Sequence, residues 1–350
     1  MVVRERVYLD WNATAPLCPE AREAMLAAMD VAGNPSSVHA EGRAARALVE
    51  RARAQVATAF GADGADVVFV SGATEAAALA CAGRGLVGSQ AEHDAVAAWI
   101  DPVLPVAADG TVRVETPGAT ALQAANSETG VVQDLPGGLA VCDATQAFGK
   151  LPVAFNWMGC DMALISAHKI GGPKGVGALV LRQGTEIAAR IRGGGQEMGR
   201  RAGTENVVGI AGFGAAAEAA QRALDDGAWA RVEKLRSVLE SLIAAGAEET
   251  IFVGKAARRL PNTSCFAVPG WKGETQVMQM DLAGFAISAG SACSSGKVRE
   301  SRLLRAMGHD AVTASSAVRV SLGPATTETD VARFTEAWLK AHERFRARAA

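Results

Sequence analysis

Lys169 has the setting of a lysine that bonds covalently to a ligand. It comes shortly after the apolar run 162–165, with Ser166 and His168 between, and the glycine-rich segment 171–175 follows it. Such a run predicts a strand, so the amine lies at a strand end within reach of a bound molecule. An amine placed in this way can form a Schiff base with an aldehyde, and pyridoxal phosphate is the aldehyde cofactor that enzymes hold so. Taken alone, Lys169 also fits a solvated surface lysine.

Two other segments supply groups that this cofactor requires. Asp143 ends a short apolar strand, and Gln146 lies three residues further on. A carboxylate there can pair with a pyridine nitrogen, although a cap or turn residue is the alternative. Residues 71–75 follow the apolar run 67–70 and open an alanine-rich helix. Its free N–H groups and the Thr74 hydroxyl could hold a phosphate, and an ordinary capping box is the alternative.

These segments and several others together match a family. The chain resembles the cysteine desulfurases of the class V, fold-type I pyridoxal phosphate enzymes, which feed sulfur to iron–sulfur cluster assembly. The resemblance runs nearly end to end, and its motifs keep one order, at residues 8–16, 33–39, 71–75, 92–93, 143–146, 166–177, 193–197, 201–204, 288–294 and 319–323.

The resemblance implies a role for each matching residue. Lys169 would form the Schiff base and move protons, and His93 would stack on the pyridine ring and assist acid–base steps. Asp143 and Gln146 would hold the ring nitrogen and the phenolic oxygen. The implied phosphate ligands are Ala73, Thr74, Ser166, His168 and, from a second subunit of a homodimer, Thr204.

The resemblance also implies where the substrate L-cysteine binds and reacts. Arg319 would clamp its carboxylate, a task that suits a two-pronged guanidinium, with help from Asn34. Cys293 stands in a stretch of small residues, 288–296, without an apolar anchor, so its loop could carry a thiol toward the substrate. Only the thiolate is a competent nucleophile. A buried, inert cysteine is the alternative.

The chain departs from the family at the cofactor's phenolic oxygen. The family usually has two adjacent asparagines, whereas this chain has Asn126 followed by Ser127. The serine is a shorter donor that could need help from Asn126 or from water. The stretches 94–125 and 131–142 are also short for the family, with Pro136 and two glycines where a crossover helix is expected. Outer helices could therefore be missing.

A rival motif is excluded by its context. Residues 83–88 match the glycine pattern of dinucleotide-binding proteins. That pattern should follow a strand and open a helix, whereas this one follows the helical run 76–82 and ends it.

Composition sets broad limits on function. The 350 residues include 35 basic and 37 acidic side chains, a formal net charge of -2, which predicts neither nucleic-acid nor membrane binding. No signal peptide or bilayer-spanning run is evident, so we expect a cytoplasmic, reduced protein. We expect no metal site or disulfide framework, because the remaining cysteines show no paired spacing; they are Cys18, Cys81, Cys142, Cys160 and Cys265.

Alternating patterns predict an α/β fold. Apolar runs at 67–70, 139–142, 162–165 and 178–181 alternate with helical patterns such as 41–60, which indicates a mostly parallel sheet wrapped by helices. As the resemblance implies, we expect a fold-type I transferase. Its large cofactor-binding domain would span 14–225, and a smaller α+β domain with the cysteine loop would combine 1–13 with 226–350.

Three interpretations of function follow. The favoured one is removal of sulfur from L-cysteine, giving L-alanine and a persulfide on Cys293 for an acceptor protein such as a cluster scaffold. The second is another class V enzyme, an aminotransferase or a selenocysteine lyase, in which Cys293 is incidental. The third is a catalytically silent relative that serves as a binding partner, which Ser127 and the shortened segments suggest.

Overall fold

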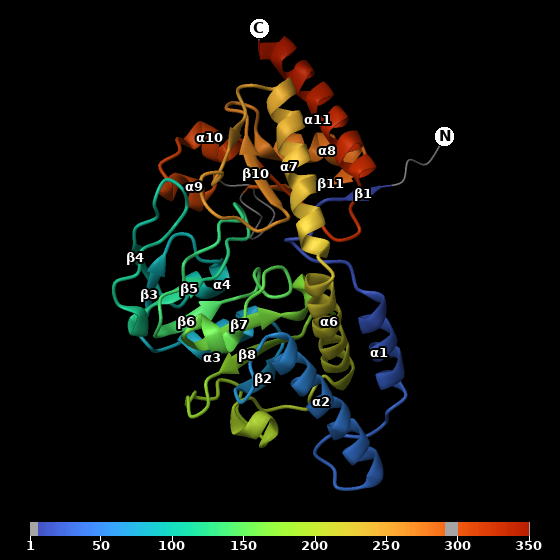
Figure 1. Ribbon diagram of the computed structural model, residues 1–350. Helices are drawn as coiled ribbons and strands as arrows, with labels where there is room; N and C mark the ends of the chain where they lie inside the picture. Colours follow the sequence, from blue (N-terminus) through green and yellow to red (C-terminus); the bar gives the residue numbers. More distant parts are fainter. Residues whose placement is uncertain (1–5, 291–299, 350) are drawn as a thin grey trace.

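The computed structural model describes residues 6–290 and 300–349. Figure 1 shows two packed regions, which the chain links near its N-terminal end and where α6 (Val207–Asp225) gives way to α7 (Ala228–Gly246). The boundary predicted at 225/226 falls between these two helices, and the division into domains stays a prediction. Within the described residues, no helix combines the length and apolar character that a membrane span requires.

A five-stranded sheet forms the centre of the first region. Its order is β2 (Asp66–Val70), β8 (Gly177–Leu181), β7 (Cys160–Ser166), β6 (Leu139–Asp143) and β5 (Ala121–Gln123). β8 runs antiparallel to both neighbours, and the other four strands share one direction. The predicted mostly parallel sheet is confirmed.

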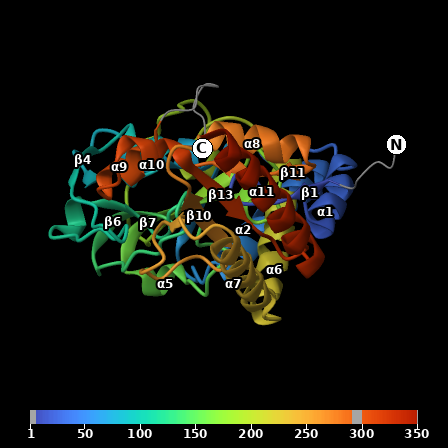
Figure 2. The same cartoon turned by 90° about the horizontal axis from the view of Figure 1, so that it is seen from above.

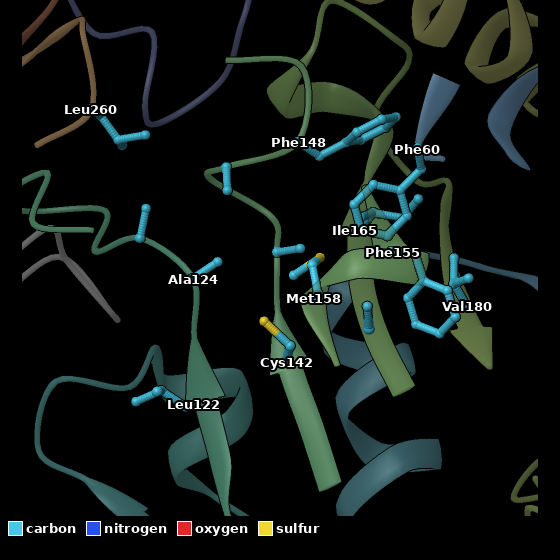
Figure 3. Close-up of a cluster of buried hydrophobic side chains, with 14 of the residues drawn as sticks. Phe60, Leu122, Ala124, Cys142, Phe148, Phe155, Met158, Ile165, Val180 and Leu260 are labelled. Atoms are coloured by element: carbon cyan, nitrogen blue, oxygen red, sulfur yellow. The ribbon is translucent and has the colours of Figure 1, made fainter. Parts of the chain in front are cut away.

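The two faces of this sheet bury alternate residues of its apolar strands. Val67, Ile165 and Val180 belong to one buried cluster, and their sequence neighbours point to another, as the twofold side-chain period of a strand requires. Figure 3 shows Phe60 near Ile165 and Phe155 in the first cluster. α3 (Ala73–Cys81) covers the opposite face.

Helices α2 (Ala40–Ala59) and α6 cover the first face, and α1 (Pro19–Met29) packs on α6. The contact of α2 with α6 is close enough to need glycine. A Cβ at Gly214 of α6 would lie 2.8 Å from the Cα of Ala52 on α2. Such a distance is below van der Waals contact, so the two helices can approach in this way only without a side chain at residue 214.

The edge of the sheet has short elements where the sequence indicates shortened segments. β3 (Val87–Ser89) pairs in parallel with β4 (Asp101–Leu104), and a bridge from Val87 to Thr120 places β3 beside β5. No helix lies between β5 and β6, as the Pro-Gly-Gly sequence at 136–138 predicts. The rival glycine motif follows α3, as predicted, because Gly83 and Gly85 take positive φ angles that end this helix.

The second region is an antiparallel sheet under helices. Its strand order is β12 (Ser288–Ala289), β13 (Ala317–Ser321), β10 (Thr263–Ala267) and β9 (Ile251–Phe252). Figure 2 shows α7, α8 (Gly273–Leu282) and α11 (Glu328–Ala349) around β10 and β13. β1 (Val7–Tyr8) pairs with β11 (Phe285–Ala286) and brings the N-terminal segment here. The remaining short helices are α4 (Asp94–Ala97), α5 (Phe155–Met158), α9 (Arg302–Ala306) and α10 (Ala311–Ser316), with 3₁₀ turns η1 (Pro117–Ala119), η2 (Ala167–Lys169) and η3 (Gln196–Gly199).

Candidate active site

A cavity of about 580 Å³ opens where β2, β5, β6 and β7 reach their carboxyl ends. Ligands bind at this edge in open α/β sheets, because loops from several strands meet there. The cavity brings together nine of the residues predicted from sequence: Ala73, Thr74, His93, Ser127, Asp143, Gln146, Ser166, His168 and Lys169.

Lys169 ends the 3₁₀ turn η2, directly after β7, so the strand fixes where its side chain begins. Its Nζ donates hydrogen bonds to the backbone oxygens of Asn12 (2.7 Å) and Ala13 (2.9 Å). Burial, followed by the charge of Arg319, lowers the pKa of this amine from 10.5 to about 8, and the carboxylate of Asp143 opposes the shift in part. A lowered pKa raises the neutral, nucleophilic fraction of a lysine at neutral pH.

The start of α3 has the features of an anion site. The helix begins at Ala73, three residues earlier than its alanine-rich run suggests, because Glu75 folds back to accept a hydrogen bond from the Ser71 N–H (2.8 Å). Gly72, the N-cap, provides no side-chain cap. The first N–H groups of a helix have no partner inside the helix, and here they border the cavity beside Thr74. The Glu75 contact supplies one of the two hydrogen bonds of a capping box, and phosphate binding by this segment stays a prediction.

His168 also borders the cavity, and its ring is neutral at neutral pH. Burial lowers the pKa of its ring from 6.5 to about 4, and the charges of Lys169 and Lys174 add to this effect. Its Nδ1 lies 3.2 Å from the Thr14 hydroxyl. The ring can therefore contribute a hydrogen bond to a phosphate but no charge at neutral pH.

Asp143, the last residue of β6, and Gln146 both border the cavity. Asp143 accepts a hydrogen bond from the Thr145 N–H (2.9 Å), so it closes the turn and also borders the cavity. Gln146 is buried, and its amide is held at both ends: Nε2 donates to the Asn12 oxygen (3.0 Å) and Oε1 accepts from Lys150 (2.6 Å). The amide consequently has one fixed orientation.

His93 is the N-cap of α4 and borders the cavity. Its Nδ1 accepts a hydrogen bond from the Ala95 N–H (3.1 Å). A ring nitrogen that accepts carries no proton, so the neutral ring has its proton on Nε2. His93 therefore caps α4 through Nδ1, and its Nε2–H is the group that can donate to a ligand in the cavity.

Asn126 and Ser127 have different surroundings. The Asn126 Oδ1 accepts from the N–H groups of Glu128 and Thr129 (2.8 Å each), and its Nδ2 donates to the Ala91 oxygen (3.1 Å). This amide organises the turn and does not border the cavity, whereas Ser127 does. Of the two, only Ser127 is therefore placed to meet a ligand.

Arg319 on β13 brings a buried charge from the second region. Its guanidinium pairs with the Asp10 carboxylate (2.6 Å) and donates to the Ser127 oxygen (3.0 Å). Its Nε has no partner among the described residues. The charge is close enough to lower the pKa of Lys169, although the residue does not itself border the cavity.

Besides Asn126 and Arg319, two more predicted residues, Asn34 and Thr204, do not border this cavity. Asn34 lies in the loop before α2, where its side chain accepts from the Ser36 N–H (2.9 Å). Thr204 is exposed, in the segment that the Arg201–Glu75 ion pair (2.9 Å) ties to the start of α3. Cys293 lies outside the described residues.

Sequence reasoning missed residues that support the site. Asn12 accepts hydrogen bonds from both Lys169 and Gln146 through its backbone oxygen, and its side chain contacts Lys150 (3.0 Å). Asn12 is in one of the motifs that carry the family resemblance, and this was its only signal. Gln123 also borders the cavity. Among the described residues, no group of three or more His, Cys, Asp and Glu is placed to hold a metal ion.

The comparisons with known proteins agree on one family. The model of the aminotransferase class-V family matches residues 7–101 and 106–334. A cysteine desulfurase of Cereibacter sphaeroides is 41% identical over 95% of this chain and 94% of its own length. A cysteine desulfurase of a Frankia species is 42% identical over 93% of this chain and 88% of its own length.

Solved structures give the same result. A NifS-like protein from Rickettsia africae has a TM-score of 0.88 and 31% identity, covering 97% of this chain and all of the other. SspA, solved in complex with cysteine, has a TM-score of 0.75 and 27% identity over 92% of this chain and all of the other. The fold-type I architecture predicted from the sequence is confirmed. The chain therefore belongs to the aminotransferase class-V family, among relatives that are cysteine desulfurases.

Proposed function

We propose that this protein is a pyridoxal-phosphate-dependent cysteine desulfurase. One observation carries the proposal: a partly buried lysine amine with a lowered pKa, Lys169, shares one cavity with a carboxylate, Asp143, and the open start of a helix. These are the three groups that hold an aldehyde, a pyridine nitrogen and a phosphate. The curated relatives named cysteine desulfurase support the choice of reaction.

The residues present fit the cofactor. Thr145 and Gln123, which border the cavity, each have a buried polar side-chain atom without a partner among the described residues. Ala73, Thr74, Ser166 and His168 would hold the phosphate, Asp143 the ring nitrogen, and Gln146 with Ser127 the phenolic oxygen. When bound, the cofactor supplies an electron sink, which helps to break bonds at or next to the α-carbon of the substrate. In this proposal Asn126 does not touch the cofactor. Its side chain stabilises the backbone turn that positions Ser127.

Lys169 and His93 perform the proton transfers in the proposal. The Lys169 amine, neutral in part at neutral pH, takes a proton from the substrate and returns one later. The Nε2 of His93 is the nitrogen available for a second transfer, because Nδ1 is engaged with Ala95. The carbonyl oxygens of Asn12 and Ala13 hold the Lys169 amine in place until it reacts.

The substrate of the proposed reaction is L-cysteine. Its carboxylate would bind Arg319 by sharing or replacing the contact with Asp10, and the unpartnered Nε of that arginine remains for it. Asn34 and Thr204 lie away from the cavity of their own chain. Thr204 would bind the phosphate at the cavity of a second copy, so the proposal includes a homodimer, and Asn34 would assist Arg319 in binding the substrate.

Cys293 accepts the sulfur. Its thiolate would attack the substrate sulfur, so that an S–S bond forms and the substrate carbon–sulfur bond breaks. The bonding electrons stay with the carbon side, which gains a proton and leaves as L-alanine. The enzyme keeps a persulfide for a sulfur-acceptor protein such as an iron–sulfur cluster scaffold. A reactive thiol of this kind suits a reducing compartment, so we place the reaction in the cytoplasm.

Incubation with L-cysteine and pyridoxal phosphate tests the proposal. We expect release of alanine and a gain of one sulfur mass on the peptide that contains Cys293, with both absent in Lys169→Ala. A Cys293→Ser variant that still turns over its amino acid at full rate would favour another class V reaction. A purified protein that binds no cofactor would favour a catalytically silent partner protein.

A further inference from the structure

Lys150 is a buried lysine that the proposed reaction does not use. Its side chain is 2% exposed and does not border the cavity. Its Nζ donates to two side-chain oxygens, Oε1 of Gln146 (2.6 Å) and Oδ1 of Asn12 (3.0 Å). Burying an amine is costly, so a lysine in this place calls for an explanation.

The first contact fixes the orientation of the Gln146 amide. A side-chain amide has an oxygen that accepts and a nitrogen that donates, and it can otherwise turn over. A protonated lysine can only donate, so Lys150 keeps the oxygen of Gln146 on its own side. The nitrogen then lies toward the Asn12 backbone oxygen, to which it donates at 3.0 Å. One of its two N–H groups is left for a ligand in the cavity.

The second contact connects Lys150 to Lys169. Asn12 is fully buried, and its side chain also accepts from Asn262 (3.1 Å) and donates to Thr263 (2.8 Å). The backbone oxygen of the same residue accepts from Lys169. Lys150 is therefore part of the support that sets the position of the carbonyl on which the reactive amine rests.

Lys150 can make both hydrogen bonds whether or not its amine is protonated. No carboxylate pairs with it among the described residues, and burial, followed by the charge of Lys169, lowers its pKa well below the usual value. A neutral amine has two N–H groups, and the structure provides two acceptors, Gln146 and Asn12. Either protonation state thus presents N–H donors to the Gln146 oxygen.

We propose that Lys150 is a positioning residue, which holds the Gln146 amide so that residue 146 donates a hydrogen bond to an oxygen of the bound cofactor. The inference rests on the proposed function, because it assumes that pyridoxal phosphate occupies the cavity. Lys150 itself touches neither cofactor nor substrate. It acts through Gln146, so the two residues should behave as one unit.

Cofactor binding by the full-length, cofactor-free protein tests the inference without measuring turnover. Pyridoxal phosphate is titrated into the protein, and its visible absorbance band gives the dissociation constant. Lys150→Met keeps an unbranched side chain of similar length but removes the donors. We expect it to weaken binding roughly tenfold, the scale of one lost hydrogen bond. Lys150→Gln, which retains an N–H donor, should restore most of the affinity. Lys234→Met on α7, at an exposed position, is the matched control.

A double-mutant cycle separates positioning from general structural damage. If Lys150 acts through Gln146, the double variant with Lys150→Met and Gln146→Met should bind no more weakly than Gln146→Met alone. Fully multiplicative losses would overturn the inference, as would normal binding by Lys150→Met. Circular dichroism checks that each variant folds. If Lys150→Met does not fold, Gln146→Glu tests the inference instead. A glutamate carboxylate accepts hydrogen bonds and cannot donate one to the cofactor oxygen, so this variant should bind the cofactor poorly. Cofactor affinity equal to that of the unsubstituted protein would overturn the inference.

The outcomes for the inference and for the proposed function are distinct. Failure of the unsubstituted protein to bind pyridoxal phosphate would overturn the proposed function and the inference with it. Binding that is equally tight in the unsubstituted protein and in Lys150→Met would overturn only the inference.

Discussion

Replacing Lys169 by methionine should stabilise the cofactor-free protein more at neutral pH than at alkaline pH. The folded chain holds the lysine amine in a site where burial and Arg319 lower its pKa from 10.5 to about 8. At neutral pH the unfolded chain therefore binds this proton more tightly than the folded chain does. The lysine consequently costs stability, and a methionine, which carries no proton, removes the cost.

The size and the sign of the effect follow from linkage. A fall in pKa from 10.5 to about 8 lowers the free energy of unfolding by about 3 kcal/mol at pH 7, below the folded pKa, where the cost is fully present. Between the two pKa values the unfolded chain binds more protons, so stability rises with pH, and only about 1 kcal/mol of the cost remains at pH 10. The lost hydrogen bonds to Asn12 and Ala13 add a penalty that we take as independent of pH.

Urea unfolding of the two proteins at pH 7 and pH 10 measures the difference. Both proteins must be free of cofactor, because a ligand that binds only the folded state adds to its stability. The free energy of unfolding of Lys169→Met minus that of the unsubstituted protein should be about 2 kcal/mol larger at pH 7 than at pH 10. The same substitution at exposed Lys234 controls for loss of a lysine as such.

An equal difference at both pH values would refute the reasoning. It would mean that the folded protein holds the Lys169 proton as tightly as the unfolded chain does, so the cavity would not prepare the amine for reaction. A difference that grows toward pH 10 would show that the site favours the charged lysine.

Three further substitutions test other parts of the site. Asn126→Ala should lower the free energy of unfolding in urea by about 2 kcal/mol, because the buried N–H of Thr129 and the partly buried N–H of Glu128 lose their acceptor; a folded variant with much weaker cofactor binding would instead indicate direct contact. Arg319→Met should raise the KM for L-cysteine and, by leaving Asp10 unpaired, cost about 3 kcal/mol of stability; an unchanged KM would remove Arg319 from the substrate site. Asp143→Asn should slow alanine release roughly a hundredfold, because an amide does not keep a pyridine nitrogen protonated; a rate close to that of the unsubstituted protein would contradict this role.

The main sheet was predictable because its strands are buried on both faces and read as short apolar runs. Ser71 follows the run 67–70 and Ser166 follows the run 162–165. In a mostly parallel sheet these strand ends lie at the same edge, so the polar residues after them are expected to lie close together. The position of Lys169 followed from the same argument. Elements that carry no such signal, among them α1, β3, β4 and β5, went unpredicted because their sequences are short or mixed.

The support of the site was not predictable, because it joins residues far apart in sequence. Asn12 lies 138 residues from Lys150 and 157 from Lys169, and its hydrogen bonds depend on how the N-terminal segment crosses the sheet. The pairing of Arg319 with Asp10 likewise joins residues 309 positions apart, because the N-terminal segment lies beside β13 of the second region. Asn126, which the sequence predicts to assist Ser127 at the cofactor, forms hydrogen bonds within its own turn and does not border the cavity.

Borohydride treatment of the protein with bound pyridoxal phosphate tests the central claim most directly. It reduces an imine to a stable amine, so peptide mass mapping then shows which lysine carried the cofactor. The account predicts the phosphopyridoxyl group on Lys169 alone and no label in Lys169→Met. A label on Lys150 or Lys174, or no label at all, would contradict it.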